Sequence, residues 1–135
     1  MTTPIDNDII GTAAMTYPTV LLPANHRDIS TSLGRFGYEV LTVSDGAEAL
    51  ALLRANRGIG VLVADVDAGG LTLAREARAI RSDLRVVYTA SAPHRVPQSS
   101  KVSDAPILRS PYAGHQLAGV ITGLGRRLLE DPLAA

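Results

Sequence analysis

The residues of this chain that could take part in chemistry lie directly after short apolar runs. In GVLVADVDAGG (60–70) the apolar run ends on a carboxylate, Asp65, and a second carboxylate, Asp67, follows closely. Burying an unpaired charge costs several kcal/mol or forces the group to neutralise, and even a neutral polar group costs roughly 2–7 kcal/mol. Asp65 is therefore expected at the mouth of a strand, where it has either a function or a bonding partner.

Three other apolar runs also end in polar side chains. These ends supply a carboxamide, hydroxyl groups and a guanidinium: Asn25 follows 19–23, Thr89 lies near the end of 84–90 and Ser91 follows it, and Arg109 and Ser110 close 105–110. If the runs are parallel strands, their carboxyl ends meet at one edge of the sheet, where this architecture places its ligands. We expect these side chains and Asp65 to form one small polar cluster there.

Periodicity divides the chain into alternating strands and helices. Short apolar runs predict strands at 19–23, 38–43, 60–64, 84–90 and 105–110. Apolar residues at helical spacing predict helices at 25–37, 44–58, 71–81 and 113–129. The segment 91–104 contains Pro93, Pro97 and several serines, so it predicts an irregular connection in place of a regular fourth helix.

Local signals mark where the helices begin, end and face the core. Asn25 predicts the N-cap of the first helix and Gly37 its end. Asp45 and Glu48 have the spacing of a capping box at the start of the second helix. The predicted inner faces are Ile29, Leu33 and Phe36; then Ala47, Leu50 and Leu53; then Leu73, Ala77 and Ile80; and finally Leu117, Val120, Ile121, Leu124 and Leu128.

This alternation predicts an α/β fold. Continuously apolar strands joined by helical crossovers indicate a parallel sheet that is covered on both faces. Right-handed crossovers that reverse direction once give a doubly wound, five-stranded parallel sheet flanked by helices. Within it we expect a leader at 1–17, one domain at 18–130 and a short tail at 131–135.

Composition excludes several classes of function. Thirteen basic and thirteen acidic residues balance, which argues against a nucleic-acid binder. The chain has no cysteine, so disulfides, thiolate metal sites and cysteine nucleophiles are excluded. No apolar run approaches the ~20 residues of a membrane span, and the N-terminal segment has no signal-peptide pattern. These features predict a cytoplasmic protein without membrane contact.

From Thr19 to about Leu129 the chain resembles the receiver domain of two-component response regulators. The segments that carry the resemblance are TVLLPANHRDI, GYEVLTVSDGAEALALL, VLVADVD, LRVVYTAS and ILRSPY followed by an amphipathic helix. The resemblance implies the receiver, or flavodoxin-like, form of the doubly wound fold. It also implies that Asp65 holds the position of the aspartate that accepts a phosphoryl group from a histidine kinase.

Several positions depart from the pattern of that family. The acidic pair that holds Mg²⁺ falls on Ala24 and Asn25, and the Lys–Pro pair falls on Ser110 and Pro111. The switch hydroxyl is kept at Thr89, whereas the switch aromatic falls on Ile107. The loop after the phosphoacceptor is shortened to VDAGG.

These departures remove charges that phosphoryl transfer needs. The reaction depends on positioning and on neutralisation by a hard cation and a fixed positive side chain, and Mg²⁺ prefers carboxylate oxygens. Asp67 is a nearby carboxylate that could help a cation but would repel a phosphoryl dianion. Arg109 is a poor substitute for the lysine because neighbouring strand residues point to opposite faces. We expect no resident cofactor and at most weak Mg²⁺ binding.

Each site residue also has a structural interpretation. Asp65 could cap the following loop through backbone N–H groups, Asn25 could be a helix N-cap, and Thr89 could be an ordinary β-branched strand residue. The three histidines, His26, His94 and His115, are scattered without metal-ligand spacing, so we interpret them as surface residues.

The favoured hypothesis is a stand-alone pseudo-receiver in phosphorelay signal transduction that is not an enzyme. It would act by contact with a histidine kinase, a phosphotransfer protein or another signalling protein, and a homodimer stays open. The predicted contact surface is the fourth helix, fifth strand and last helix, with Arg109 and Tyr112 as anchors. The alternative is a working phosphoacceptor that uses Asp65 with atypical metal chemistry. A flavodoxin-like enzyme or nucleotide binder has little support because the chain lacks a phosphate loop.

Overall fold

The computed structural model describes residues 18–102 and 104–134, with side chains as far as Leu124. The expected leader at 1–17 lies outside the described residues. No helix in the described part is both long and apolar enough to cross a membrane.

Five strands and four α-helices make up most of the described chain. The strands are β2 (Thr19–Pro23), β3 (Val40–Val43), β4 (Ile59–Asp65), β5 (Arg85–Ala90) and β6 (Ile107–Arg109). The α-helices are α2 (Arg27–Arg35), α3 (Gly46–Ala55), α4 (Gly70–Ile80) and α5 (Gly114–Ala134). Four short 3₁₀ turns join them: η1 (Ala24–His26), η2 (Val66–Ala68), η3 (Pro93–Arg95) and η4 (Gln98–Ser100).

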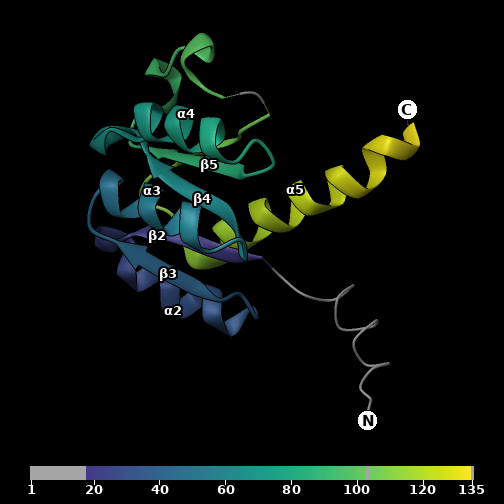
Figure 1. The fold of residues 1–135 in the computed structure, drawn as a ribbon, viewed down its shortest axis with the longest axis horizontal. Coiled ribbons are helices and arrows are strands. Elements are labelled where there is room, and N and C mark those ends of the chain that lie inside the picture. The colour runs from purple at the N-terminus through teal and green to yellow at the C-terminus, as the bar shows by residue number, and fades with distance from the viewer. Residues whose placement is uncertain (1–17, 103, 135) are drawn as a thin grey trace.

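The strands form one parallel sheet in the order β3-β2-β4-β5-β6. From β2 the chain first moves outward to β3 and then returns to add β4, β5 and β6 on the other side (Figure 1). The predicted doubly wound, five-stranded α/β fold is therefore confirmed. The direction of winding reverses between β2 and β4, so their carboxyl ends form the crevice where such folds bind ligands.

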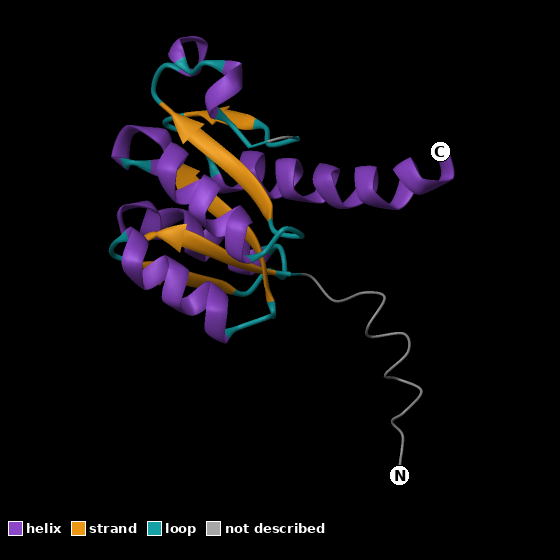
Figure 2. Cartoon of the chain, turned by 45° about the horizontal axis from the view of Figure 1, so that its top comes forward, coloured by secondary structure: helices purple, strands orange, loops and turns teal. Residues whose placement is uncertain are grey.

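Helices cover both faces of the sheet, and each face has its own apolar core (Figures 1 and 2). Leu62, Ala64 and Tyr88 face α3 and α4. Val61 and Val63 face α2 and α5. From Val61 onward, the alternation along β4 puts odd-numbered residues on the α2–α5 face, and Asp65 continues that series at the end of the strand.

The strongest local predictions hold at α3. The Asp45 side chain accepts a hydrogen bond from the Glu48 backbone N–H at 2.8 Å, and the Glu48 side chain accepts one from the Ser44 N–H at 2.8 Å. The bond to Asp45 satisfies a backbone donor that the first turn of the helix leaves unpaired, and the bond to Glu48 ties the residue before the N-cap to the helix. The inner face differs in one position, because Ala47 is exposed whereas Ala49 is buried with Leu53.

The first predicted helix differs more. Asn25 is not its N-cap, because Ala24–His26 forms a 3₁₀ turn and α2 begins at Arg27 without a side-chain cap. Gly37, with φ of 95°, follows the end of the helix as predicted. Phe36 lies beyond α2 and is 49% exposed, so its assignment to the buried face is wrong.

The segment between β5 and β6 has no α-helix in its described residues. It contains only η3 and η4, each starting next to or at a proline. The predicted irregular fourth helix is therefore confirmed. At the other end of the chain, α5 continues beyond the predicted boundary at 129 to Ala134.

Candidate functional site

Asp65 ends β4, and the glycines after it explain the VDAGG sequence. The Asp65 Oδ1 atom accepts a hydrogen bond from the Asp67 N–H at 3.0 Å, which starts η2. Gly69 has φ of 83°, a left-handed conformation that favours glycine. A Cβ on Gly70 would lie 2.6 Å from the Asp65 carbonyl oxygen, so α4 can begin this close to the strand end only with glycine there.

The other carboxylate oxygen of Asp65 is bonded to a histidine. His26 Nε2 lies 3.2 Å from Asp65 Oδ2, and the two side chains are only 10% and 13% exposed. The η1 turn after β2 places His26 over the neighbouring strand end. The interpretation of His26 as a surface residue is therefore wrong.

A tyrosine from the last connection completes this chain of hydrogen bonds. His26 Nδ1 lies 2.7 Å from the Tyr112 hydroxyl oxygen, and the two ring centroids are 5.7 Å apart. Burial, and then the negative charge of Asp65, raise the pKa of the Tyr112 hydroxyl. The neutral phenol can donate its proton to Nδ1 while Nε2–H donates to Asp65. When the imidazole is protonated, both of its nitrogens donate and the phenol oxygen accepts.

Thr89 stands beside Asp65 on β5. The two residues are register partners in the parallel pair β4–β5, and Thr89 is fully buried. Among the buried side-chain nitrogen and oxygen atoms of the described residues, Thr89 Oγ1 is the one without a hydrogen-bond partner. Buried hydroxyls are nearly always bonded, so this atom marks unused hydrogen-bonding capacity next to the carboxylate.

The remaining predicted site residues are only partly gathered around Asp65. Ala24 and Asn25 line a hollow of about 410 Å³ that Asp65 also borders, at the carboxyl ends of β2, β3 and β4. The Asp67 carboxylate accepts a hydrogen bond from the Ser91 N–H at 3.0 Å, which ties the loops after β4 and β5 together.

The residues at the end of β6 do not bond to Asp65, contrary to the predicted cluster. Arg109 is exposed, and the backbone N–H of Ser110, which precedes Pro111, donates to the Ala90 carbonyl at 2.8 Å. Ile107 is partly buried and packs against the core that faces α3 and α4. In place of the predicted single cluster, the structure has the bonded trio Asp65, His26 and Tyr112, with Thr89 beside it.

His26 is the site residue that sequence reasoning missed. Its partners are 39 and 86 positions away in the sequence, so no local spacing identifies it. A possible signal was its place directly after the first strand, at the same sheet edge as Asp65. Within the described residues there is no group of three or more His, Cys, Asp or Glu side chains that could hold a metal ion.

Comparisons with solved structures agree with the fold. No family model matches the chain, and no curated protein matches it. Among solved structures, the chain is similar to a response regulator receiver protein from Sinorhizobium medicae WSM419, with 28% identity and a TM-score of 0.69. That match covers 82% of this chain and 95% of the other.

Two further matches have lower identity and show the fold alone. A receiver domain protein from Clostridium thermocellum matches with 21% identity and a TM-score of 0.69, covering 84% of this chain and 98% of the other. A CheY-like receiver domain protein from Methanospirillum hungatei JF-1 matches with 16% identity and a TM-score of 0.69, covering 86% and 99%. The chain therefore has the fold of response-regulator receiver domains.

Proposed function

We propose that this chain is a receiver-type domain of two-component signalling that acts by protein–protein contact without phosphorylation of Asp65. The observation that carries the proposal is the 3.2 Å hydrogen bond from His26 to Asp65. It engages the one carboxylate oxygen that the Asp67 N–H leaves available. Asp65 is thus bonded within the chain at the position where receivers expose an acceptor.

The charges around Asp65 support this proposal. The Ala24 side chain offers no oxygen ligand, Asn25 is neutral and exposed, and Ser110 stands at the position of the family's lysine. The Asp67 carboxylate is directed to the Ser91 amide. Mg²⁺ requires several oxygen ligands in near-octahedral geometry, so these residues fit that ion poorly. We expect weak Mg²⁺ binding and little or no stable phosphorylation.

The proposed output is a surface held in one dominant state. Ile107 has no aromatic ring to move between buried and exposed positions, so this route to a population shift is absent. The proposed contact edge contains Ile107, the exposed Arg109 and the half-buried Tyr112. A histidine kinase, a phosphotransfer protein or another cytoplasmic signalling protein would bind there, and the domain would have no catalytic activity of its own.

Intact-mass measurement after incubation with acetyl phosphate and Mg²⁺ tests the proposal. We expect the wild-type chain to gain no phosphoryl group. The triple variant Ala24→Asp, Asn25→Asp, Ser110→Lys should gain some reactivity. Adding His26→Ala to it should increase labelling further, whereas adding His94→Ala, a matched change at an exposed histidine, should not. A wild-type phosphoryl adduct that Asp65→Asn abolishes would refute the proposal.

One observation favours the alternative of a working phosphoacceptor. The unpartnered Thr89 Oγ1 could donate a hydrogen bond to an oxygen of a phosphoryl group on Asp65. In this alternative His26 would leave Asp65 before the transfer. The mass measurement separates the two functions, because only the alternative gives a wild-type adduct.

A further inference from the structure

An exposed aromatic ring lies on the α2–α5 side of the molecule. Among the large apolar side chains of the described residues, Phe36 is the one that is exposed, with 49% of its surface accessible. Its backbone is well fixed, because the Phe36 N–H donates to the Leu33 carbonyl at 3.0 Å and Leu33 is fully buried. The ring is therefore held at a fixed place on the folded body, although folding does not bury it.

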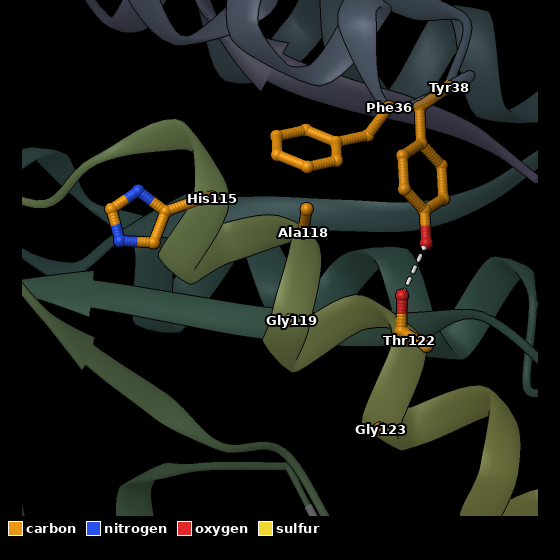
Figure 3. Close-up of a pocket in the computed structure, with 7 residues that line it drawn as sticks. All are labelled: Phe36, Tyr38, His115, Ala118, Gly119, Thr122 and Gly123. Atoms are coloured by element: carbon orange, nitrogen blue, oxygen red, sulfur yellow. Dashed lines mark hydrogen bonds between the residues drawn. The ribbon is translucent and has the colours of Figure 1, made fainter.

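A hollow of about 350 Å³ lies directly beside this ring, between the end of α2 and the middle of α5. Figure 3 shows Phe36 and Tyr38 on one side of it and the α5 residues on the other, with the Tyr38 hydroxyl bonded to Thr122 at 3.0 Å. Binding pockets for compact ligands begin at about this size, so one aromatic side chain can enter. The full lining is Phe36, Tyr38, His115, Ala118, Gly119, Thr122 and Gly123.

Two glycines of α5 create part of the hollow. A Cβ added to Gly119 or Gly123 would meet no heavy atom within 4 Å. Nothing inside the described chain therefore requires glycine at these positions, although glycine weakens the interior of a helix relative to alanine. A ring that enters from another molecule would use the space that the missing side chains leave.

The patch has the two complementary features that a self-association surface needs. A two-fold interface uses the same surface on both copies, so one patch must supply both the projecting group and its receptor. Here the projecting ring and the hollow adjoin each other. The lining contains no Lys, Arg, Asp or Glu, and the whole chain has zero formal net charge, so two copies approach without net repulsion. Interface cores are likewise poor in charge and rich in aromatic residues.

We propose that this patch, Phe36 with the hollow beside Gly119 and Gly123, binds a second copy of the chain in a two-fold dimer. Phe36 of each copy enters the hollow of the other and packs against its α5. This dimer is independent of the proposed function. If the dimer does not form, the proposal about Asp65 and the mass measurement that tests it are unaffected.

Sedimentation equilibrium of the full chain over a wide concentration range tests the proposal. We expect a monomer–dimer equilibrium, and at least about a tenfold weaker dimer for Phe36→Ser, as for an aromatic hot spot. Gly119→Leu fills the hollow and should weaken the dimer equally while raising the melting temperature, because glycine is replaced in a helix. Loss of the dimer then cannot be due to unfolding. Ala79→Leu, at an exposed position of α4, is the control and should leave the dimer unchanged.

Thiol cross-linking places the contact, since the chain has no cysteine of its own. A bismaleimide should link Gly119→Cys into a covalent dimer, should not link Ala79→Cys, and should fail when Phe36→Ser is added to Gly119→Cys. A chain that is monomeric at every concentration would overturn the proposal, including the case in which residues 1–17 or another protein cover the hollow. A dimer that neither Phe36→Ser nor Gly119→Leu weakens would also overturn it.

Discussion

His26 joins residues that are distant in sequence, through bonds to Asp65 and Tyr112. If His26 is removed, the Asp65 carboxylate keeps, among the described residues, its hydrogen bond from the Asp67 N–H and loses the one from the imidazole. A largely buried carboxylate that loses its partner is costly, and a hydrogen bond to a charged group contributes about 1.5–3 kcal/mol. The trio is therefore important for stability as well as for the state of Asp65.

We predict that His26→Ala lowers the free energy of unfolding by about 1–3 kcal/mol. Urea denaturation at neutral pH measures the change. His94→Ala, at an exposed histidine in η3, is the matched control and should change it by less than about 0.5 kcal/mol. Equal, small effects of the two substitutions would show that the bond to Asp65 contributes little.

Tyr112 gives a prediction about alkaline pH. Its hydroxyl pKa is raised in the folded state, so the unfolded chain ionises first as the pH rises above about 10. The unfolded state then binds fewer protons than the folded state, and stability falls by up to about 1.4 kcal/mol per pH unit. Tyr112→Phe should therefore lose less stability than the wild type between pH 9 and pH 11 in urea denaturation. Parallel losses would mean that the hydroxyl pKa is not raised.

Helix α3 offers a direct test of how a local signal stabilises an element. Asp45→Ala removes the side-chain acceptor for the Glu48 N–H, and we predict a loss of about 1 kcal/mol in the free energy of unfolding. Asp28→Ala changes an exposed acid in the first turn of α2, which has no side-chain cap, and is the control. Thermal or urea unfolding of both variants measures the difference, and the cap is unimportant if they are equally stable.

The irregular connection between β5 and β6 should open easily. In η3 and η4 the backbone bonds are single 3₁₀ turns, such as Val96 N–H to Pro93 O at 3.1 Å and Lys101 N–H to Gln98 O at 3.2 Å. Isolated turns open at low free energy, whereas α3 packs on the core through Ala49 and Leu53. Amide exchange should be much faster at 95–101 than at 49–56. Protection as strong as in α3 would show that the connection packs as a stable unit.

Local pattern predicted the elements whose signals lie within a few residues. The apolar run of β4 and the capping box of α3 are of this kind, and the prolines of the fourth connection likewise indicated its irregular form. Phe36 was misassigned because helical periodicity was continued one residue past the end of α2, where Gly37 turns the chain.

The candidate site was predictable only in outline. Asp65 was placed correctly because a carboxylate is costly inside an apolar strand and is therefore expected at the strand's end. The bond from His26 was not predictable, because it requires the relative placement of β2, β4 and the segment before α5. The sequence predicted Asn25 as the N-cap of the first helix. In the structure Asn25 lies within the 3₁₀ turn Ala24–His26, and this turn places His26 at the site.

Taken over the entire fold, the molecule carries two surfaces with different chemistry. The carboxyl ends of β2, β4 and β5 hold Asp65 and its partners, while the α2–α5 side carries the patch of Phe36. In the proposed function, the contact surface stays in one state because the Asp65 carboxylate is already bonded within the chain. The proposed function depends on that carboxylate staying bonded when a phosphoryl-like ligand is present.

The amide NMR spectrum of the ¹⁵N-labelled full chain, recorded with Mg²⁺ and increasing beryllofluoride, tests this directly. Beryllofluoride imitates a phosphoryl group on a carboxylate. If His26 keeps Asp65 engaged and the surface has one dominant state, the signals of Asp65, Thr89, Ile107 and Tyr112 should not move. Saturable shifts at these residues that are absent in Asp65→Asn would contradict the proposed function.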